Sequence, residues 1–145
     1  MNHSEYSMLG SASYNPKDLV LKMIKKIQLN SKNAKKYLEM SHFSAISERL
    51  INSIHLLEEL DMSLNRNNEN PTVERVSMHY QWLMQVYEEI LESIDEDKFD
   101  EERFNEIIEL ADVVVTNLYE GFEGMIDENE DNMEEDRNEE DESNR

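Results

Sequence analysis

The sequence contains no cysteine, which excludes disulfide bonds, thiol catalysis and metal sites built from thiolates. This composition fits a reducing compartment, and we expect a cytoplasmic protein. Only 3 glycines and 2 prolines occur among 145 residues, so tight β-turns are disfavoured and helices are favoured. The longest apolar runs, such as Val113–Val115, are far too short to span a bilayer, and no secretory signal is recognisable.

Basic residues are also scarce, because 14 lysines and arginines stand against 34 acidic residues, for a net charge of −20. Such a chain repels a phosphate backbone, so we expect no nucleic-acid partner. The net charge is +4 over residues 1–50, −15 over 51–126 and −9 over 127–145. The last of these segments has Met133 as its single apolar residue, which predicts a disordered acidic tail over 127–145. Residues 1–14 are predicted to form a flexible N-terminal segment.

Four amphipathic segments fill the remaining chain, at about residues 16–38, 41–64, 71–94 and 101–122, with apolar residues every three or four positions. Asparagine followed by proline opens the first and third segments, at Asn15-Pro16 and Asn70-Pro71, and Asp100 caps the fourth. The connections are short, so sequential helices should be antiparallel neighbours. We therefore predict an all-α fold, an antiparallel up-down-up-down four-helix bundle over residues 15–126.

Candidate catalytic and metal-binding patterns are incomplete. Glu39-x-x-His42 has the spacing of a di-iron bundle ligand pair, but no other histidine has a glutamate three residues before it. His55 and His79 are followed by bulky residues, which a phosphotransfer histidine usually avoids. No nucleophile with a suitably spaced base and no glycine-rich phosphate loop is present. We predict no catalytic residue, no metal and no cofactor.

Methionine is abundant, with 9 residues, and it is over-used on surfaces that accept varied apolar partners. The methionines beside the apolar stripes can be ordinary core residues. Together with the aromatic residues of the third segment they suggest a groove for an amphipathic helix of a partner. The predicted groove residues are Met23, Leu57, Met62, Met78, Tyr80, Trp82, Met84 and Tyr87.

Four short motifs occur in the order and spacing of a known family. They are Asn15-Pro16-Lys17-Asp18-Leu19 followed by Lys22-Met23-Ile24, the run from Leu56 to Leu64, the segment His79-Tyr80-Gln81-Trp82-Leu83, and Tyr6 ahead of the first helix. Across about residues 5–120 the chain resembles the flagellin-specific export chaperones (FliS). Glu69-Asn70-Pro71 replaces the Gly-Gly of that family, and the acidic tail is not a family feature.

The resemblance implies a four-helix bundle that binds the C-terminal segment of flagellin in the cytoplasm. It also implies that the chain prevents premature polymerisation and delivers its client to the flagellar type III export gate. Tyr6, Met8 and Leu9 would then cover the groove as a displaceable plug. We expect a monomer or weak homodimer that does not insert into membranes. The alternative is a non-enzymatic helical adaptor or dimerisation bundle that uses the same apolar groove.

Overall fold

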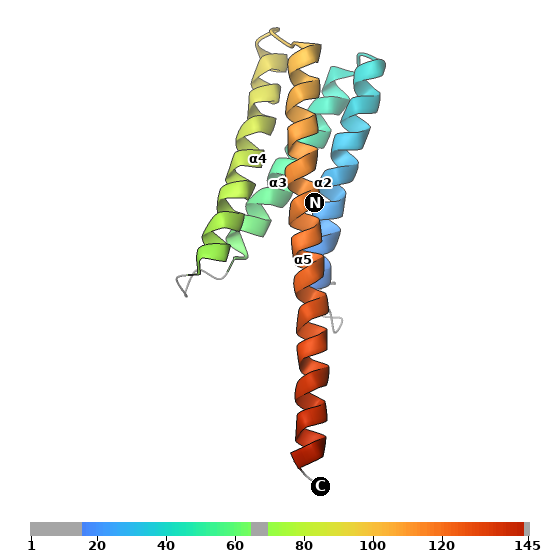
Figure 1. Cartoon of the computed structure of the whole chain (residues 1–145). Coiled ribbons are helices and arrows are strands. Elements are labelled where there is room, and N and C mark those ends of the chain that lie inside the picture. The colour runs from blue at the N-terminus through green and yellow to red at the C-terminus, as the bar shows by residue number, and fades with distance from the viewer. Residues whose placement is uncertain (1–15, 65–69, 144–145) are drawn as a thin grey trace, which may run out of the picture.

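The computed structural model of the chain describes residues 16–64 and 70–143, with the backbone alone for 125–143 (Figure 1). Its regular structure over those ranges is entirely helical, and the helices are α2 (Pro16–Glu39), α3 (Phe43–Met62), α4 (Pro71–Asp95) and α5 (Glu101–Ser143). They pack as a four-helix bundle in which α2 contacts α3 and α5, and α4 contacts α3 and, least extensively, α5. The α2–α3 and α4–α5 connections lie at one end of the bundle. None of these helices combines the length and the apolar character needed to cross a membrane.

The starts of α4 and α5 are fixed by polar side chains that cap exposed backbone N–H groups. Asn70 Oδ1 accepts a hydrogen bond from the Thr72 backbone N–H at 2.9 Å, and Pro71 occupies the first turn. Asp100 Oδ1 accepts one from the Glu102 N–H at 3.1 Å. Both capping residues are those predicted from the sequence.

The ends of α2 and α4 reverse the chain without glycine. Ser41 and Asp97 have φ values of 52° and 56°, in the left-handed region that glycine usually occupies at a helix end. After α2, the His42 N–H donates to the Tyr37 carbonyl oxygen at 2.9 Å, which is the six-to-one hydrogen bond of a Schellman motif. These turns explain how a helical bundle is built from so few glycines.

The core is a single apolar cluster to which all four helices contribute. Its largest fully buried side chains are Tyr80, Tyr87, Phe104, Ile24, Ile27, Ile46, Leu50, Leu56, Leu57, Leu60, Leu83 and Ile108. Asn30, a polar residue within the apolar pattern of α2, is buried as well. Asn30 Nδ2 donates to Asn52 Oδ1 at 2.9 Å and to Ser53 Oγ at 3.0 Å. These hydrogen bonds fix the register of α2 against α3, because a shifted register would leave the Asn30 amide buried without them.

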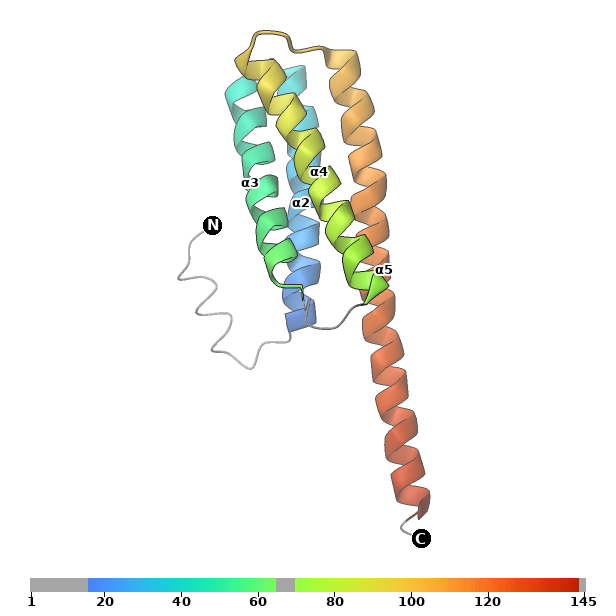
Figure 2. The same ribbon diagram turned by 90° about the vertical axis from the view of Figure 1, so that its left-hand side faces the viewer.

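The C-terminal part of α5 differs from the predicted disordered tail. The helix does not end near residue 126 but continues to Ser143, beyond the ends of the other helices (Figure 2). Lengthening an existing helix adds one hydrogen bond for each residue fixed, whereas starting a new helix is unfavourable. Glutamate is a good helix former, and no proline or glycine follows Gly124. The predicted flexible segment 1–14 lies outside the described residues.

Candidate partner-binding cleft

A cleft lies between the N-terminal half of α4 and the part of α5 that faces it. The cleft has a volume of about 360 Å³. Its lining residues are Leu64, Asn70, Thr72, Val73, Arg75, Val76, His79, Asn117, Leu118, Gly121 and Phe122.

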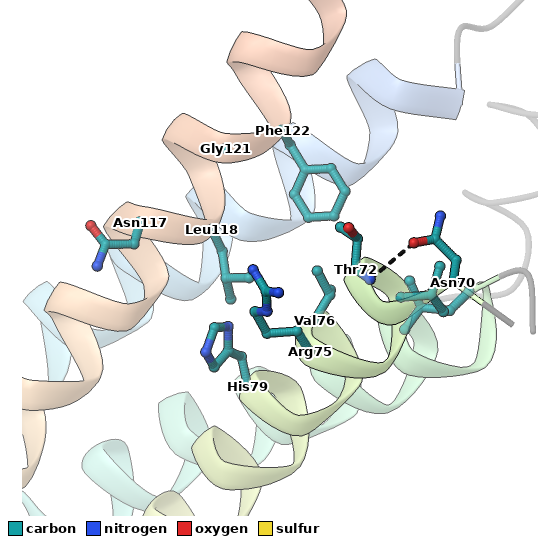
Figure 3. Close-up of a pocket in the computed structure, with 11 residues that line it drawn as sticks. Asn70, Thr72, Arg75, Val76, His79, Asn117, Leu118, Gly121 and Phe122 are labelled. Atoms are coloured by element: carbon teal, nitrogen blue, oxygen red, sulfur yellow. Dashed lines mark hydrogen bonds between the residues drawn. The ribbon is translucent and has the colours of Figure 1, made fainter.

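The floor and walls of the cleft are largely apolar. Leu118 is 7 % exposed and belongs to the core, whereas Val76 and Phe122 are partly buried and pack against that core. In Figure 3, Leu118 and Phe122 project from α5 toward α4. A Cβ atom added to Gly121 would meet no atom within 4 Å, so the α5 wall is open at this position.

The N-terminal half of α4 is held against α3 by a polar contact. Ser77 Oγ donates a hydrogen bond to Asp61 Oδ1 at 2.6 Å, and Gln81 Nε2 donates to Ser77 Oγ at 3.2 Å. Tyr80 lies on the same side of α4 and is 1 % exposed. Burial, together with the negative charge of Asp61, raises the pKa of Tyr80 well above its usual value. These contacts bind α4 to α3, and the side facing α5 is left more open.

The charge of the cleft differs from that of the chain as a whole. Arg75 and His79 line it, and none of its described lining residues is acidic, although acidic residues outnumber basic ones by 34 to 14 in the sequence. The remaining polar lining groups are the uncharged side chains of Asn70, Thr72 and Asn117. An apolar partner segment with an acidic flank therefore meets no repulsion from these lining groups.

An apolar line continues from the cleft along the seam between α4 and α5. Leu110 lies two turns before Asn117 and two turns after Arg103, so it shares their side of α5. Arg103 faces α4, because its Nη2 atom lies 3.1 Å from Glu89 Oε1. Leu110 is 57 % exposed and Val114 is partly buried. The accessible apolar surface is thus longer than the cleft alone.

The eight predicted groove residues do not share one surface. Met23, Leu57, Tyr80 and Tyr87 are at most 6 % exposed and belong to the core, where a partner cannot reach them while the bundle is closed. Met84 is partly buried against the core. Met62, Met78 and Trp82 are exposed at 83 %, 68 % and 37 %, and none of the eight lines the cleft. The predicted plug residues Tyr6, Met8 and Leu9 fall outside the described part of the chain.

In the Glu39-x-x-His42 pair, the histidine has a structural role. His42 is the N-cap of α3, and its Nδ1 atom accepts a hydrogen bond from the Ala45 backbone N–H at 3.3 Å. The His42 ring also lies 5.8 Å from that of Tyr37, centroid to centroid. Among the residues whose side chains are described, no three histidine or acidic side chains gather in a way that could hold a metal ion.

The sequence pattern does not distinguish the residues that line the cleft from those of the core. Val76, Leu118 and Phe122 lie on the same apolar stripes as the core residues, and Gly121 is the only local sign of an open wall. No protein-family model, curated protein or solved structure matches this chain.

Proposed function

We propose that this chain is a non-enzymatic holding chaperone that binds an amphipathic helix of its client along the α4–α5 seam. The observation that carries the proposal is the apolar cleft, whose described lining has no acidic residue although the chain is strongly acidic. A cleft of about 360 Å³ is too small for a helix but large enough for a few apolar side chains. A client helix would lie across it and insert anchors spaced three or four residues apart.

The acidic surface outside the cleft supports the same function. A holding chaperone has to keep an aggregation-prone client segment in solution, and a high net charge opposes association between complexes. The exposed acidic residues of α3, α4 and α5 supply that charge. The cleft thus binds apolar side chains, and the acidic surface keeps the complex soluble.

The resemblance to the flagellin export chaperones supplies a specific client. We propose the C-terminal segment of flagellin, held in the cytoplasm before delivery to the flagellar export gate. In this proposal successive helices of the bundle are antiparallel, as in that family, and the chain acts as a monomer or weak homodimer. Binding would keep the segment from polymerising prematurely, because the surface needed for filament contacts would be covered.

The test fills the cleft without removing a core side chain. Gly121→Leu places an isobutyl group at the open wall, and Gly124→Leu places the same group on the same helix at an exposed position outside the cleft lining. Both variants are titrated calorimetrically with the C-terminal segment of flagellin from the same organism. The N-terminal segment of that flagellin serves as the ligand control.

We expect sub-micromolar, one-to-one binding by the unmodified chain with a negative heat-capacity change, because apolar surface is buried. Gly121→Leu should weaken binding by about tenfold or more, which corresponds to about 1.4 kcal/mol, and Gly124→Leu should leave it unchanged. Absence of binding by the unmodified chain would refute flagellin as the client. Equal affinities of the two variants would refute the cleft as the site.

The alternative function is an adaptor or dimerisation bundle that uses the same cleft. Exposed Met78 and Trp82 on α4 favour it, because a second copy would cover these apolar side chains outside the cleft, whereas a client bound in the cleft alone leaves them exposed. If the cleft mediates self-association, Gly121→Leu should make the protein monomeric in the absence of any client. Sedimentation of the two glycine variants distinguishes this function from the chaperone.

A further inference from the structure

The outward face of α2 is a basic strip on an otherwise acidic molecule. The buried residues of α2, such as Ile24, Ile27 and Ala34, lie on the side of the helix opposite this strip. The basic strip consists of Lys22, Lys25, Lys32 and Lys36 around Leu29, all of them exposed. Helix α2 carries 7 lysines and 2 acidic residues, whereas α3 and α4 each contain a single basic residue.

Two lysines of α2 interact with side chains of α5. Lys35 Nζ lies 2.7 Å from Asp112 Oδ2, and Lys25 Nζ lies 5.5 Å from the centroid of the Tyr119 ring. Leu29 is 47 % exposed and lies seven residues from each end of the strip. The strip thus offers positive charge around a central apolar group, which suits an acidic helix that has one apolar residue near its middle.

The chain itself contains such a helix. The acidic extension, which we define as residues 125–143 of α5, carries 11 acidic residues and a single basic one, Arg137. Met133 is the only apolar residue after Ile126, and it lies close to the middle of the extension. The extension is about 28 Å long at 1.5 Å per residue, compared with about 21 Å from Lys22 to Lys36. It is long enough to cover the strip.

The direction of α5 prevents the extension from reaching the strip of its own chain. Figure 2 shows α5 running straight past the bundle and away from α2. An intramolecular contact would require the helix to break and reverse near Gly124, whereas the helix is continuous through that residue. The strip of a second molecule requires no such break.

We propose that the acidic extension of one molecule docks on the basic strip of α2 of a second copy. The contact is electrostatic, with Leu29 as its apolar centre. At physiological salt the Debye length is about 8 Å, so the apposed charges attract while the more distant acidic surfaces of the two bundles are largely screened. The contact lies away from the cleft and goes beyond the proposed chaperone function, because it describes how copies assemble with or without a client.

The test is the mass of the full-length protein in solution, measured by sedimentation equilibrium up to hundreds of micromolar. At about 150 mM NaCl we expect a concentration-dependent increase above the 17.2 kDa monomer, lost at about 500 mM NaCl because salt screens the contact. Lys32→Gln with Lys36→Gln should raise the dissociation constant by about tenfold or more. The control pair Gln85→Glu with Asn105→Glu gives the same net charge at exposed sites outside the strip and should have a smaller effect.

A charge exchange shows whether the contact is between molecules. Lys32→Glu with Lys36→Glu in one chain, and Glu134→Lys with Glu135→Lys in another, should each weaken self-association. An equimolar mixture should associate more strongly than the strip variant alone, because the second chain supplies an unmodified strip and the first an unmodified extension. The single chain that carries all four changes should associate again.

Three results would overturn the proposal. The first is a monomer at about 150 mM NaCl at all concentrations. The second is four-change chains that remain monomeric. The third is association that is lost in Gly121→Leu but unchanged in the lysine variants, which would assign the contact to the cleft. A failure of flagellin binding leaves this test unaffected, so the two proposals can be judged separately.

Discussion

The contact between Ser77 and Asp61 should be worth more than a typical surface hydrogen bond. Ser77 is 4 % exposed and donates to a carboxylate at 2.6 Å, and a hydrogen bond to a charged group contributes about 1.5–3 kcal/mol. Asp61 is only partly buried, so solvent reduces that figure, and we expect about 1–2 kcal/mol for Ser77→Ala. For a cooperative unit of about 110 residues, the melting temperature should fall by roughly 4 °C for each kcal/mol lost.

The assay is urea and thermal unfolding followed by circular dichroism at the helical band. Ser77→Ala, Asp61→Asn and the double variant form a cycle, and the coupling energy isolates the pair from their other contacts. We expect a coupling of about 1 kcal/mol with an unchanged denaturant slope. Additive effects, with no coupling, would refute the conclusion that this hydrogen bond holds α4 against α3.

The same cycle also tests the position of the cleft. If α4 is held toward α3 by this contact, its loss should let the N-terminal half of α4 move and alter the cleft wall. Client affinity should then fall in Ser77→Ala although Ser77 does not line the cleft. Unchanged affinity in a destabilised variant would show that the wall is set by other contacts.

Two further predictions concern the core and a helix end. Burial, together with the negative charge of Asp112, raises the pKa of Tyr87 from 10.0 to about 12, so this residue's contribution to stability is complete below pH 10 and is lost as the pH rises toward 12. Tyr87→Phe should reduce the loss of stability measured by denaturant unfolding across that interval, and an unchanged pH dependence would contradict the assignment. Ser41→Gly should stabilise the fold by roughly 0.5–1 kcal/mol, because Ser41 has a φ of 52°. A lower melting temperature for Ser41→Gly would contradict this explanation.

The helices and their starts could be predicted because local chemistry determines them. Asn70 and Asp100 satisfy backbone N–H groups within two residues of themselves, and the apolar period identifies which side of each helix is buried. The extent of α5 could not be predicted in the same way. Composition distinguishes segments that can form a core from those that cannot, but an acidic segment attached to an existing helix can continue it without any core.

The division between core and cleft was decided only by the tertiary structure. Tyr80 and Phe122 lie on similar apolar stripes, yet Tyr80 is enclosed by the bundle and Phe122 lines an opening. The difference arises because α4 is drawn to α3 by a contact between residues 16 positions apart, and α5 is left partly uncovered. The sequence by itself determined four amphipathic helices, the N-caps of α4 and α5 and an uneven charge. The packing of those helices against one another decided which apolar groups remain accessible, because such packing depends on contacts between distant segments.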